Sequence, residues 1–264
     1  MRKAFIDFIT EEAIINKDLI LITADLGFGL FDDFAERFPE QFINAGISEQ
    51  NMTSMACGLA LEGCKVFTYS IGNFSTLRCL EQIRNDVCYH DANVTVVCVG
   101  AGFSYGQLGV SHFATEDISI IRALPNISIL SPCDPWEADL LLKQTNSIKG
   151  PKYLRIDKTN ANSTIGELQF GIPRKCSEGK DAIIFATGGI VKEALKVAEE
   201  LKALNIGKDN EVLIPSLTFI ATANAVKIAG AEPIFVDINK NNFSICPEKL
   251  DSYLKEISFQ KNGK

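Results

Sequence analysis

The sequence predicts an α/β protein with a doubly wound parallel sheet, followed by a smaller α/β unit. Strand-sized apolar segments alternate with segments of helical periodicity along most of the 264 residues, and this alternation is typical of a parallel sheet covered by helices on both faces. The clearest strand, residues 95–99 (TVVCV), is an almost continuous apolar run, as expected for a strand buried on both sides. With 46% hydrophobic residues, the chain is long enough to enclose such a core.

Six strands are expected in the first part of the chain, at residues 19–24, 42–44, 65–69, 95–99, 127–130 and 153–156. Asp134 and Glu137 form a capping box with Pro135 at the first helical position, which predicts a helix to about residue 144. A second helix is expected over residues 74–88.

A linker is expected at residues 160–179, where Asn, Ser, Gly and Pro accumulate and the apolar periodicity fades. Beyond it we predict a strand at 181–186 and a helix that ends at Gly207. The apolar face of that helix comprises Ile190, Ala194, Val197, Ala198 and Leu201. Two more strands, at 212–214 and 234–236, are expected to flank a helix around 221–228.

Composition excludes several classes of protein. The formal charge of −7 comes without a basic patch or stripe, which argues against general affinity for nucleic acid. No apolar run approaches the length of a membrane span, and the N-terminus lacks the pattern of a secretion signal. Eight cysteines are scattered without a Cys-x-x-Cys pair, as expected for buried thiols in a reducing cytoplasm.

Two segments carry the candidate chemistry. Residues 46–52 (GISEQNM) place Glu49 at a strand-to-helix turn, and residues 106–112 (GQLGVSH) form a glycine-rich loop that ends in His112, one of two histidines. Glycines let a backbone approach a ligand closely. By position alone, however, a glutamate at a helix start is commonly a favourable partner of the helix dipole, and a lone loop histidine is often incidental.

Residues 1 to about 207 resemble the C-terminal half of transketolase, specifically the small subunit of two-chain transketolases. The matching pieces are, in order, residues 24–26 (ADL), 46–52, Phe74 followed by Arg78 and 81–85 (EQIRN), Gly109-x-Ser111-His112 with Glu116-Asp117, and Pro132-x-Asp134. The resemblance implies that residues 1–165 are a pyrimidine-binding domain for thiamine diphosphate. Residues 166–207 would begin the following domain.

The resemblance also implies roles for five residues. Glu49 is the carboxyl group that activates the cofactor by hydrogen bonding to the aminopyrimidine, Phe74 stacks on that ring, and Asp25 belongs to a matching cofactor-binding segment. His112 contacts the sugar near its reacting carbonyl and moves protons, and Arg155 binds the phosphate of the sugar. Taken alone, Phe74 is more often a core residue, and Arg155 is equally well explained as one partner of a structural ion pair.

Some positions depart from the family. Leu108 and Gly100 stand where transketolases usually carry an aspartate and a histidine that contact donor hydroxyls, Gly29 replaces a serine that often helps hold phosphate, and Phe113 replaces a glutamine. A site that has lost hydroxyl partners is expected to accept a substrate lacking the hydroxyl. We therefore expect a modified or deoxy sugar.

The motif that holds magnesium and diphosphate in this family is missing. The resemblance implies a partner chain that supplies it, with magnesium on that partner and two copies of each chain in a heterotetramer. The expected reaction is transfer of a two-carbon ketol unit between sugars. Acyloin synthesis, as in deoxyxylulose-phosphate synthase, and a catalytically silent fusion or scaffold subunit are the alternatives.

Residues 208–264 differ in character. They hold seven Lys and seven Asp or Glu, so the acidic excess lies entirely in the first 207 residues. Residues 208–225 and 233–238 resemble an internal piece of a pyridoxal-phosphate-dependent sugar aminotransferase. The phosphate loop and a recognisable Schiff-base lysine motif of that family are missing, so aminotransferase activity is not expected.

Overall fold

The computed structural model describes residues 1–161, 167–179, 183–204, 211–215, 231–239 and 245–257. Two compact units are present, one formed by residues 1–176 with 186–193, the other by 177–185 with 194–264. The first unit contains a six-stranded sheet in the order β2-β1-β3-β4-β6-β5, and every neighbouring pair is parallel. The predicted parallel α/β architecture is confirmed.

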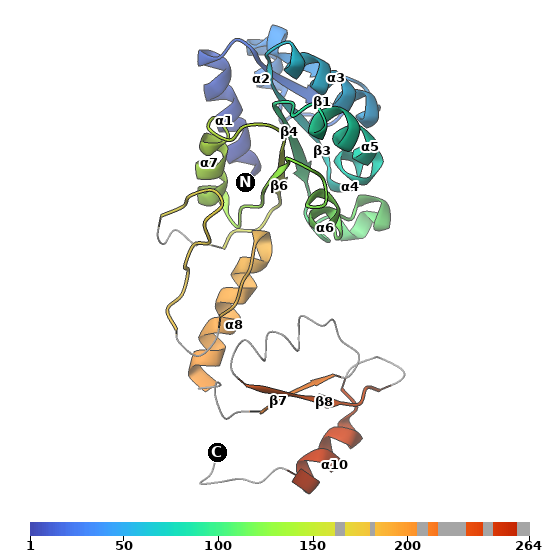
Figure 1. Ribbon diagram of the computed structural model, residues 1–264, viewed down its shortest axis with the longest axis vertical. Coiled ribbons are helices and arrows are strands. Elements are labelled where there is room, and N and C mark those ends of the chain that lie inside the picture. Colours follow the sequence, from blue (N-terminus) through green and yellow to red (C-terminus); the bar gives the residue numbers. More distant parts are fainter. Residues whose placement is uncertain (162–166, 180–182, 205–210, 216–230, 240–244, 258–264) are drawn as a thin grey trace. The chain divides into compact units, whose positions relative to one another are not determined.

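All six predicted strands of this sheet are present, within one to two residues at each end. Their bounds are β1 (Leu19–Thr23), β2 (Phe42–Asn44), β3 (Lys65–Ile71), β4 (Val94–Val99), β5 (Ser128–Leu130) and β6 (Lys152–Ile156). The helices of this unit are α1 (Arg2–Ile15), α2 (Asp32–Arg37), α3 (Glu49–Leu61), α4 (Gly72–Ser75), α5 (Leu80–Gln82), α6 (Asp117–Ile121) and α7 (Pro135–Gln144). α1 and α7 lie on one side of the sheet, and α3 and α5 on the other (Figure 1).

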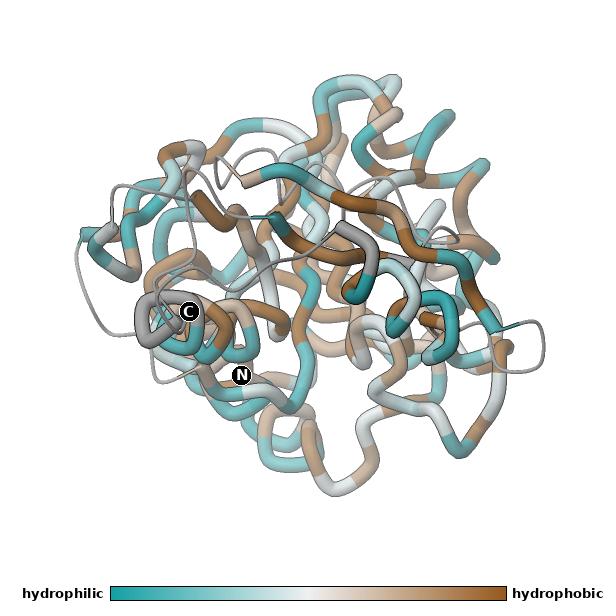
Figure 2. Tube along the Cα trace, turned by 90° about the horizontal axis from the view of Figure 1, so that it is seen from below, coloured by the Kyte–Doolittle hydropathy of each residue, from teal (hydrophilic) through white to brown (hydrophobic). Residues whose placement is uncertain are grey.

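Two apolar cores form because successive strand residues point to opposite faces of the sheet. Leu21 joins one core, with Phe5 of α1 and Leu142 of α7. Its neighbour Ile22 joins the other, with Met52 of α3. The apolar stretches of the chain are the brown segments of the tube in Figure 2. Burial on both faces explains why the strands read as apolar runs rather than as alternating patterns.

The capping box builds the start of α7 as predicted. The Asp134 carboxylate accepts a hydrogen bond from the Glu137 N–H (2.9 Å), and the Glu137 carboxylate accepts one from the backbone of Cys133 (2.6 Å). The helix runs from Pro135 to Gln144.

The helix predicted over residues 74–88 is wrong as a continuous element. After α4 the chain breaks at Thr76 (φ −121°, ψ −83°), then continues through the turn Leu77–Cys79, α5 and the π-helix Ile83–Cys88. The Thr76 hydroxyl donates to the Gly72 carbonyl (2.6 Å). Such side-chain bonds compete with helix formation, and the break turns Phe74 and Arg78 toward the same site.

In the second unit, β7 (Glu211–Pro215) and β8 (Glu232–Val236) pair in parallel. The predicted strands at 212–214 and 234–236 are therefore confirmed. Helix α8 (Val191–Leu204) contains Ala194, Val197 and Ala198 of the predicted apolar face. Ile190 precedes the helix, and both Ile190 and Val197 are exposed. Helix α10 (Pro247–Ile257) was not foreseen.

Other predictions for this region have a different outcome. A strand was predicted at 181–186, but residues 183–186 form none, because no strand among the described residues pairs with them. Residues 181–182 lie outside the described part of the chain. Gly207 and the helix around 221–228 also lie outside it. Among the described residues, no helix is long and apolar enough to cross a membrane.

Two buried lysines lie at the amino edge of the sheet. Lys65 begins β3 and pairs with Glu12 (3.1 Å), and Lys152 begins β6 and donates to the Gly150 carbonyl (2.5 Å) and the Asn93 amide oxygen (2.9 Å). Burial, together with repulsion from Lys65, lowers the pKa of Lys152 to about 8 from its ordinary value of 10.5.

This shift predicts a pH-dependent difference in stability. Between pH 8 and 10.5 the unfolded chain holds a proton on Lys152 that the folded chain releases, so stability from this group rises with pH. Relative to Lys152→Met, the wild type should gain up to about 1.4 kcal/mol of unfolding free energy per pH unit in this window. Urea unfolding across the window measures the gain, and the exposed Lys149→Met serves as the control. Parallel stability curves for the wild type and Lys152→Met would contradict it.

Candidate active site

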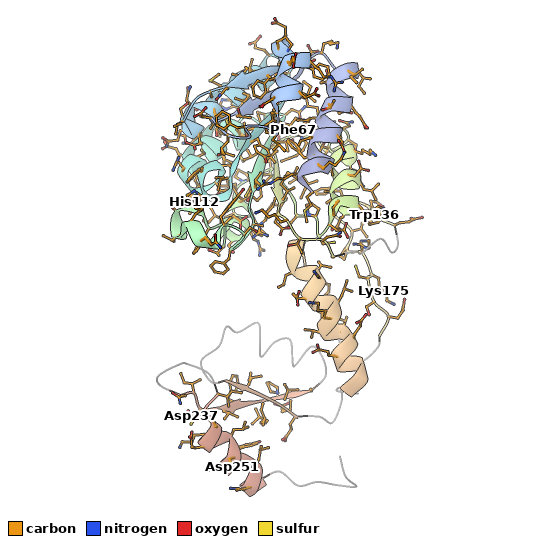
Figure 3. The ribbon with its side chains drawn as sticks, turned by 180° about the vertical axis from the view of Figure 1, so that it is seen from behind. Phe67, His112, Trp136, Lys175, Asp237 and Asp251 are labelled. Atoms are coloured by element: carbon orange, nitrogen blue, oxygen red, sulfur yellow. The ribbon has the colours of Figure 1, made fainter. Side chains whose placement is uncertain are left out.

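The residues singled out from the sequence follow successive strands of the sheet. Asp25 lies just after β1, Glu49 after β2, Phe74 after β3 and His112 in the loop after β4, while Arg155 lies within β6. Parallel strands bring their carboxyl ends to one edge, which is where ligands bind in open α/β sheets. Figure 3 shows His112 and Trp136 at this end of the unit and Phe67 within the sheet.

A tight turn carries Glu49 into the site. Gly46 has φ +73°, a conformation that glycine adopts without strain, and its N–H donates to the Asn44 side chain (3.0 Å). The Ser48 hydroxyl donates to the Ala45 carbonyl (2.7 Å), and α3 begins at the next residue. Glu49 is thereby held at the start of α3 with only 4% of its surface exposed.

Arg78 connects Glu49 to Phe74. Its Nη1 donates to Glu49 Oε2 at 2.8 Å, and its guanidinium carbon lies 4.1 Å from the centre of the Phe74 ring. The Arg78 side chain is 44% exposed, in contrast to the buried carboxylate that it contacts. A buried carboxylate, a cation and an aromatic face thus meet at one point.

His112 lies beside the same aromatic ring. The centres of the His112 and Phe74 rings are 5.0 Å apart, and the Asn73 amide donates to the Ser111 carbonyl (2.8 Å), which ties α4 to the His112 loop. The loop is closed at its base by a pair of backbone hydrogen bonds between Gly102 and Ala114. The structure therefore brings Glu49, Phe74 and His112 together, as expected for residues of one site.

Asp25 and Arg155 have other contacts. Asp25 adopts φ +52°, and it exchanges hydrogen bonds with Asn44 through its N–H (3.0 Å) and its carboxylate (3.3 Å). Arg155 donates through Nε to Asp117 (2.6 Å) and through Nη2 to the Ala114 carbonyl (3.0 Å). The ion pair between Arg155 and the buried Asp117 is the structural arrangement that the sequence left open beside phosphate binding.

Tyr105 and Arg2 complete the surroundings of His112, and neither was singled out from the sequence. The Tyr105 ring lies 6.3 Å from the His112 ring, and its hydroxyl accepts a hydrogen bond from Arg2 (2.5 Å). No local pattern could have joined Arg2 to Tyr105, because 103 positions separate them. Arg78 had a signal, because it belongs to the segment that resembles transketolase.

Gly100 makes room for Tyr105. Gly100 has φ +92°, and a Cβ there would overlap the Tyr105 ring. Gly100→Ala should therefore lower the free energy of unfolding by about 1–3 kcal/mol, through overpacking added to backbone strain. Adding Tyr105→Ala should recover the overpacking part. Thermal unfolding tests both.

Gly106→Ala is the matched control, because Gly106 lies in the same loop, has open space around its Cα and does not require positive φ. Equal stability of the Gly100 and Gly106 variants would contradict the packing of Tyr105 against Gly100.

Comparison with known proteins identifies two family matches along the chain. Residues 1–164 match the model of the transketolase pyrimidine-binding domain, and residues 187–258 match that of the DegT/DnrJ/EryC1/StrS aminotransferase family. The second match covers a minor part of the chain, in agreement with the change of character predicted for the tail.

Individual relatives agree with the first match. A protein from Methanocaldococcus jannaschii whose name refers to a transketolase C-terminal section is 35% identical, over 87% of this chain and 78% of its own length. One of the subunits of apulose-4-phosphate transketolase from Phocaeicola vulgatus is 32% identical, over 78% of this chain and 67% of its own. The solved structure of a split-gene transketolase, an inactive β4 tetramer, is 26% identical with a TM-score of 0.66, covering 98% of this chain and 86% of that one.

Proposed function

Because the chain belongs to the transketolase pyrimidine-binding domain family, we propose that it is one subunit of a thiamine-diphosphate-dependent transferase that moves a two-carbon ketol unit between sugars. The observation that carries this proposal is the buried Glu49 at the carboxyl edge of the sheet, connected through Arg78 to the ring of Phe74. Relatives of this chain include proteins named as transketolase subunits, which are transferases.

The residues present fit the cofactor. A carboxylate that is 4% exposed is suited to share a proton with a ring nitrogen, because little water competes for it, and a neighbouring aromatic ring offers a stacking face. When bound, thiamine diphosphate supplies a nucleophilic thiazolium carbon. Glu49 would hold the proton at the aminopyrimidine, Phe74 would support the ring, and Asp25 would shape the turn beside them.

His112 is proposed to contact the sugar. Its Nδ1 lies 3.0 Å from the Ser111 hydroxyl, so the ring is held while Nε2 remains for proton transfer at the reacting carbonyl. Arg155 is proposed to bind the sugar phosphate, although Nε and Nη2 already donate within the protein. Of the five N–H groups of the guanidinium, the two on Nη1 and one on Nη2 would then remain for phosphate.

A partner chain would complete the site. Large apolar side chains are exposed in the loops at the carboxyl edge, with Phe28 at 77%, Ile47 at 80% and Val110 at 79% exposure. Exposed apolar residues grouped around a site are typical of an interface. The partner would supply the diphosphate and magnesium site, in a heterotetramer with two copies of each chain.

The sugar is proposed to be a modified or deoxy sugar. Leu108 and Gly100 offer no polar side chain to a donor hydroxyl, and the space beside Gly100 is filled by the ring of Tyr105. A hydroxyl directed at these positions would lose its hydrogen-bond partners, which favours a substrate without it.

The chain is proposed to comprise three segments. Residues 1–165 would form the pyrimidine-binding domain, 166–207 the start of the next transketolase domain, and 208–264 an aminotransferase-like segment without catalysis of its own. The match of residues 187–258 to an aminotransferase family supports the last of these.

Calorimetric titration tests the proposal. The full chain is mixed with a diphosphate-binding transketolase N-terminal subunit, and thiamine diphosphate is added with Mg²⁺. Saturable binding by the mixture but not by the chain alone is expected, followed by ketol transfer. Consumption of pyruvate would instead indicate acyloin synthesis, and lack of binding by the mixture would indicate a silent subunit.

A further inference from the structure

One side chain makes both of the contacts that the proposed cofactor ring requires. The Arg78 guanidinium hydrogen-bonds to Glu49 Oε2 (2.8 Å) and lies over the Phe74 ring, 4.1 Å from its centre. An aminopyrimidine bound in the proposed way is also planar, also shares a hydrogen bond with Glu49, and also stacks on Phe74. The guanidinium and the ring therefore need the same space.

We propose that Arg78 is a positioning residue that stands in for the aminopyrimidine in the cofactor-free chain and moves away when the ring docks. This inference rests on the proposed function. Arg78 lies in the turn Leu77–Cys79, directly after the break at Thr76. Since 44% of its side chain is already exposed, the guanidinium can reach solvent by rotating its own side chain.

The ion pair between Arg78 and Glu49 has different consequences with and without the cofactor ring. Without a ring, Arg78 compensates a carboxylate that would otherwise be buried and unpaired, a costly arrangement. With the ring in place, Glu49 would hydrogen-bond to the aminopyrimidine, and the guanidinium could no longer occupy the same position. Departure of Arg78 thus opens the aromatic face and frees the Glu49 carboxylate for the ring.

Competition of this kind predicts that removing Arg78 strengthens binding. In the complex with the diphosphate-binding subunit, thiamine diphosphate should bind Arg78→Ala roughly fivefold more tightly than the wild type, as expected for losing one partly exposed ion-pair competitor. Arg78→Lys, which keeps the charge but loses the planar stack, should fall between them. Calorimetric titration measures all three, with the exposed Arg84→Ala as the matched control on the same helical stretch.

A second readout follows Arg78 in the wild type, and it is needed if Arg78→Ala fails to fold. Nitrogen-15 spectra of the Arg78 guanidinium should show faster hydrogen exchange with solvent once thiamine diphosphate is added. A residue that only supported the fold would give lower stability and weaker binding on substitution, the opposite direction.

The outcomes separate the two proposals. If the wild type binds thiamine diphosphate and Arg78→Ala binds it equally or more weakly, the role of Arg78 is overturned and the proposed function stands. The same holds if hydrogen exchange of the guanidinium does not change. If neither protein binds thiamine diphosphate in the complex, the proposed function itself fails, and the inference about Arg78 fails with it.

Discussion

Glu49→Gln should slow removal of the thiazolium proton from bound thiamine diphosphate by roughly 10²–10⁴-fold, the usual contribution of a positioned acid–base group. Glutamine fills the same volume, and its amide oxygen can still accept from Arg78. It cannot share a proton with the cofactor ring. The exchange of that proton for deuterium, measured by NMR after acid quenching of the two-chain complex, reports this step without any need to know the sugar.

Glu62→Gln provides the matched control for this substitution. Glu62 follows the other end of α3 and is exposed, so the same change of charge there should leave the exchange rate unaltered. An unchanged rate in Glu49→Gln, with cofactor still bound, would remove Glu49 from the chemistry. It would favour the simpler interpretation of a glutamate that stabilises a helix start.

The sheet could be predicted from the sequence because its strands are buried on both faces. Apolar runs such as Val94–Val99 and turn residues between them are local signals, and they placed all six strands of the first unit. The expectation that Glu49, Phe74 and His112 share one site came from the resemblance to transketolase. The parallel sheet explains it, since the carboxyl ends of its strands lie at one edge.

The side-chain partnerships could not be predicted, because they depend on distant segments. Arg78 and Glu49 are 29 positions apart, and Arg155 and Asp117 are 38 apart. The helix over residues 74–88 failed for a local reason instead: the hydroxyl of Thr76 binds the Gly72 carbonyl, a competition that apolar periodicity does not report. The packing of Tyr105 against Gly100 likewise depends on the folded loop and leaves no local pattern in the sequence.

Arg155→Met should lower the free energy of unfolding by about 3–5 kcal/mol, because it removes one partner of a buried ion pair. Asp117 is 1% exposed and accepts hydrogen bonds at Oδ2 from Arg155 (2.6 Å) and the Tyr153 hydroxyl (2.7 Å). Its Oδ1 is buried without a hydrogen-bond partner among the described residues. Loss of the guanidinium would leave this carboxylate with a single hydroxyl donor, and urea unfolding of the full chain measures the cost.

Two further variants decide whether the pair or the arginine alone matters. Combining Arg155→Met with Asp117→Leu should recover much of the lost stability, because the buried charge disappears with its partner. Lys143→Met, which breaks the exposed pair with Asp139 (2.7 Å), should cost at most about 0.5 kcal/mol. If Arg155→Met costs no more than Lys143→Met, Asp117 does not need the guanidinium. Arg155 would then be available to bind a sugar phosphate with all of its donors, and its conversion to methionine should weaken phosphorylated substrates selectively.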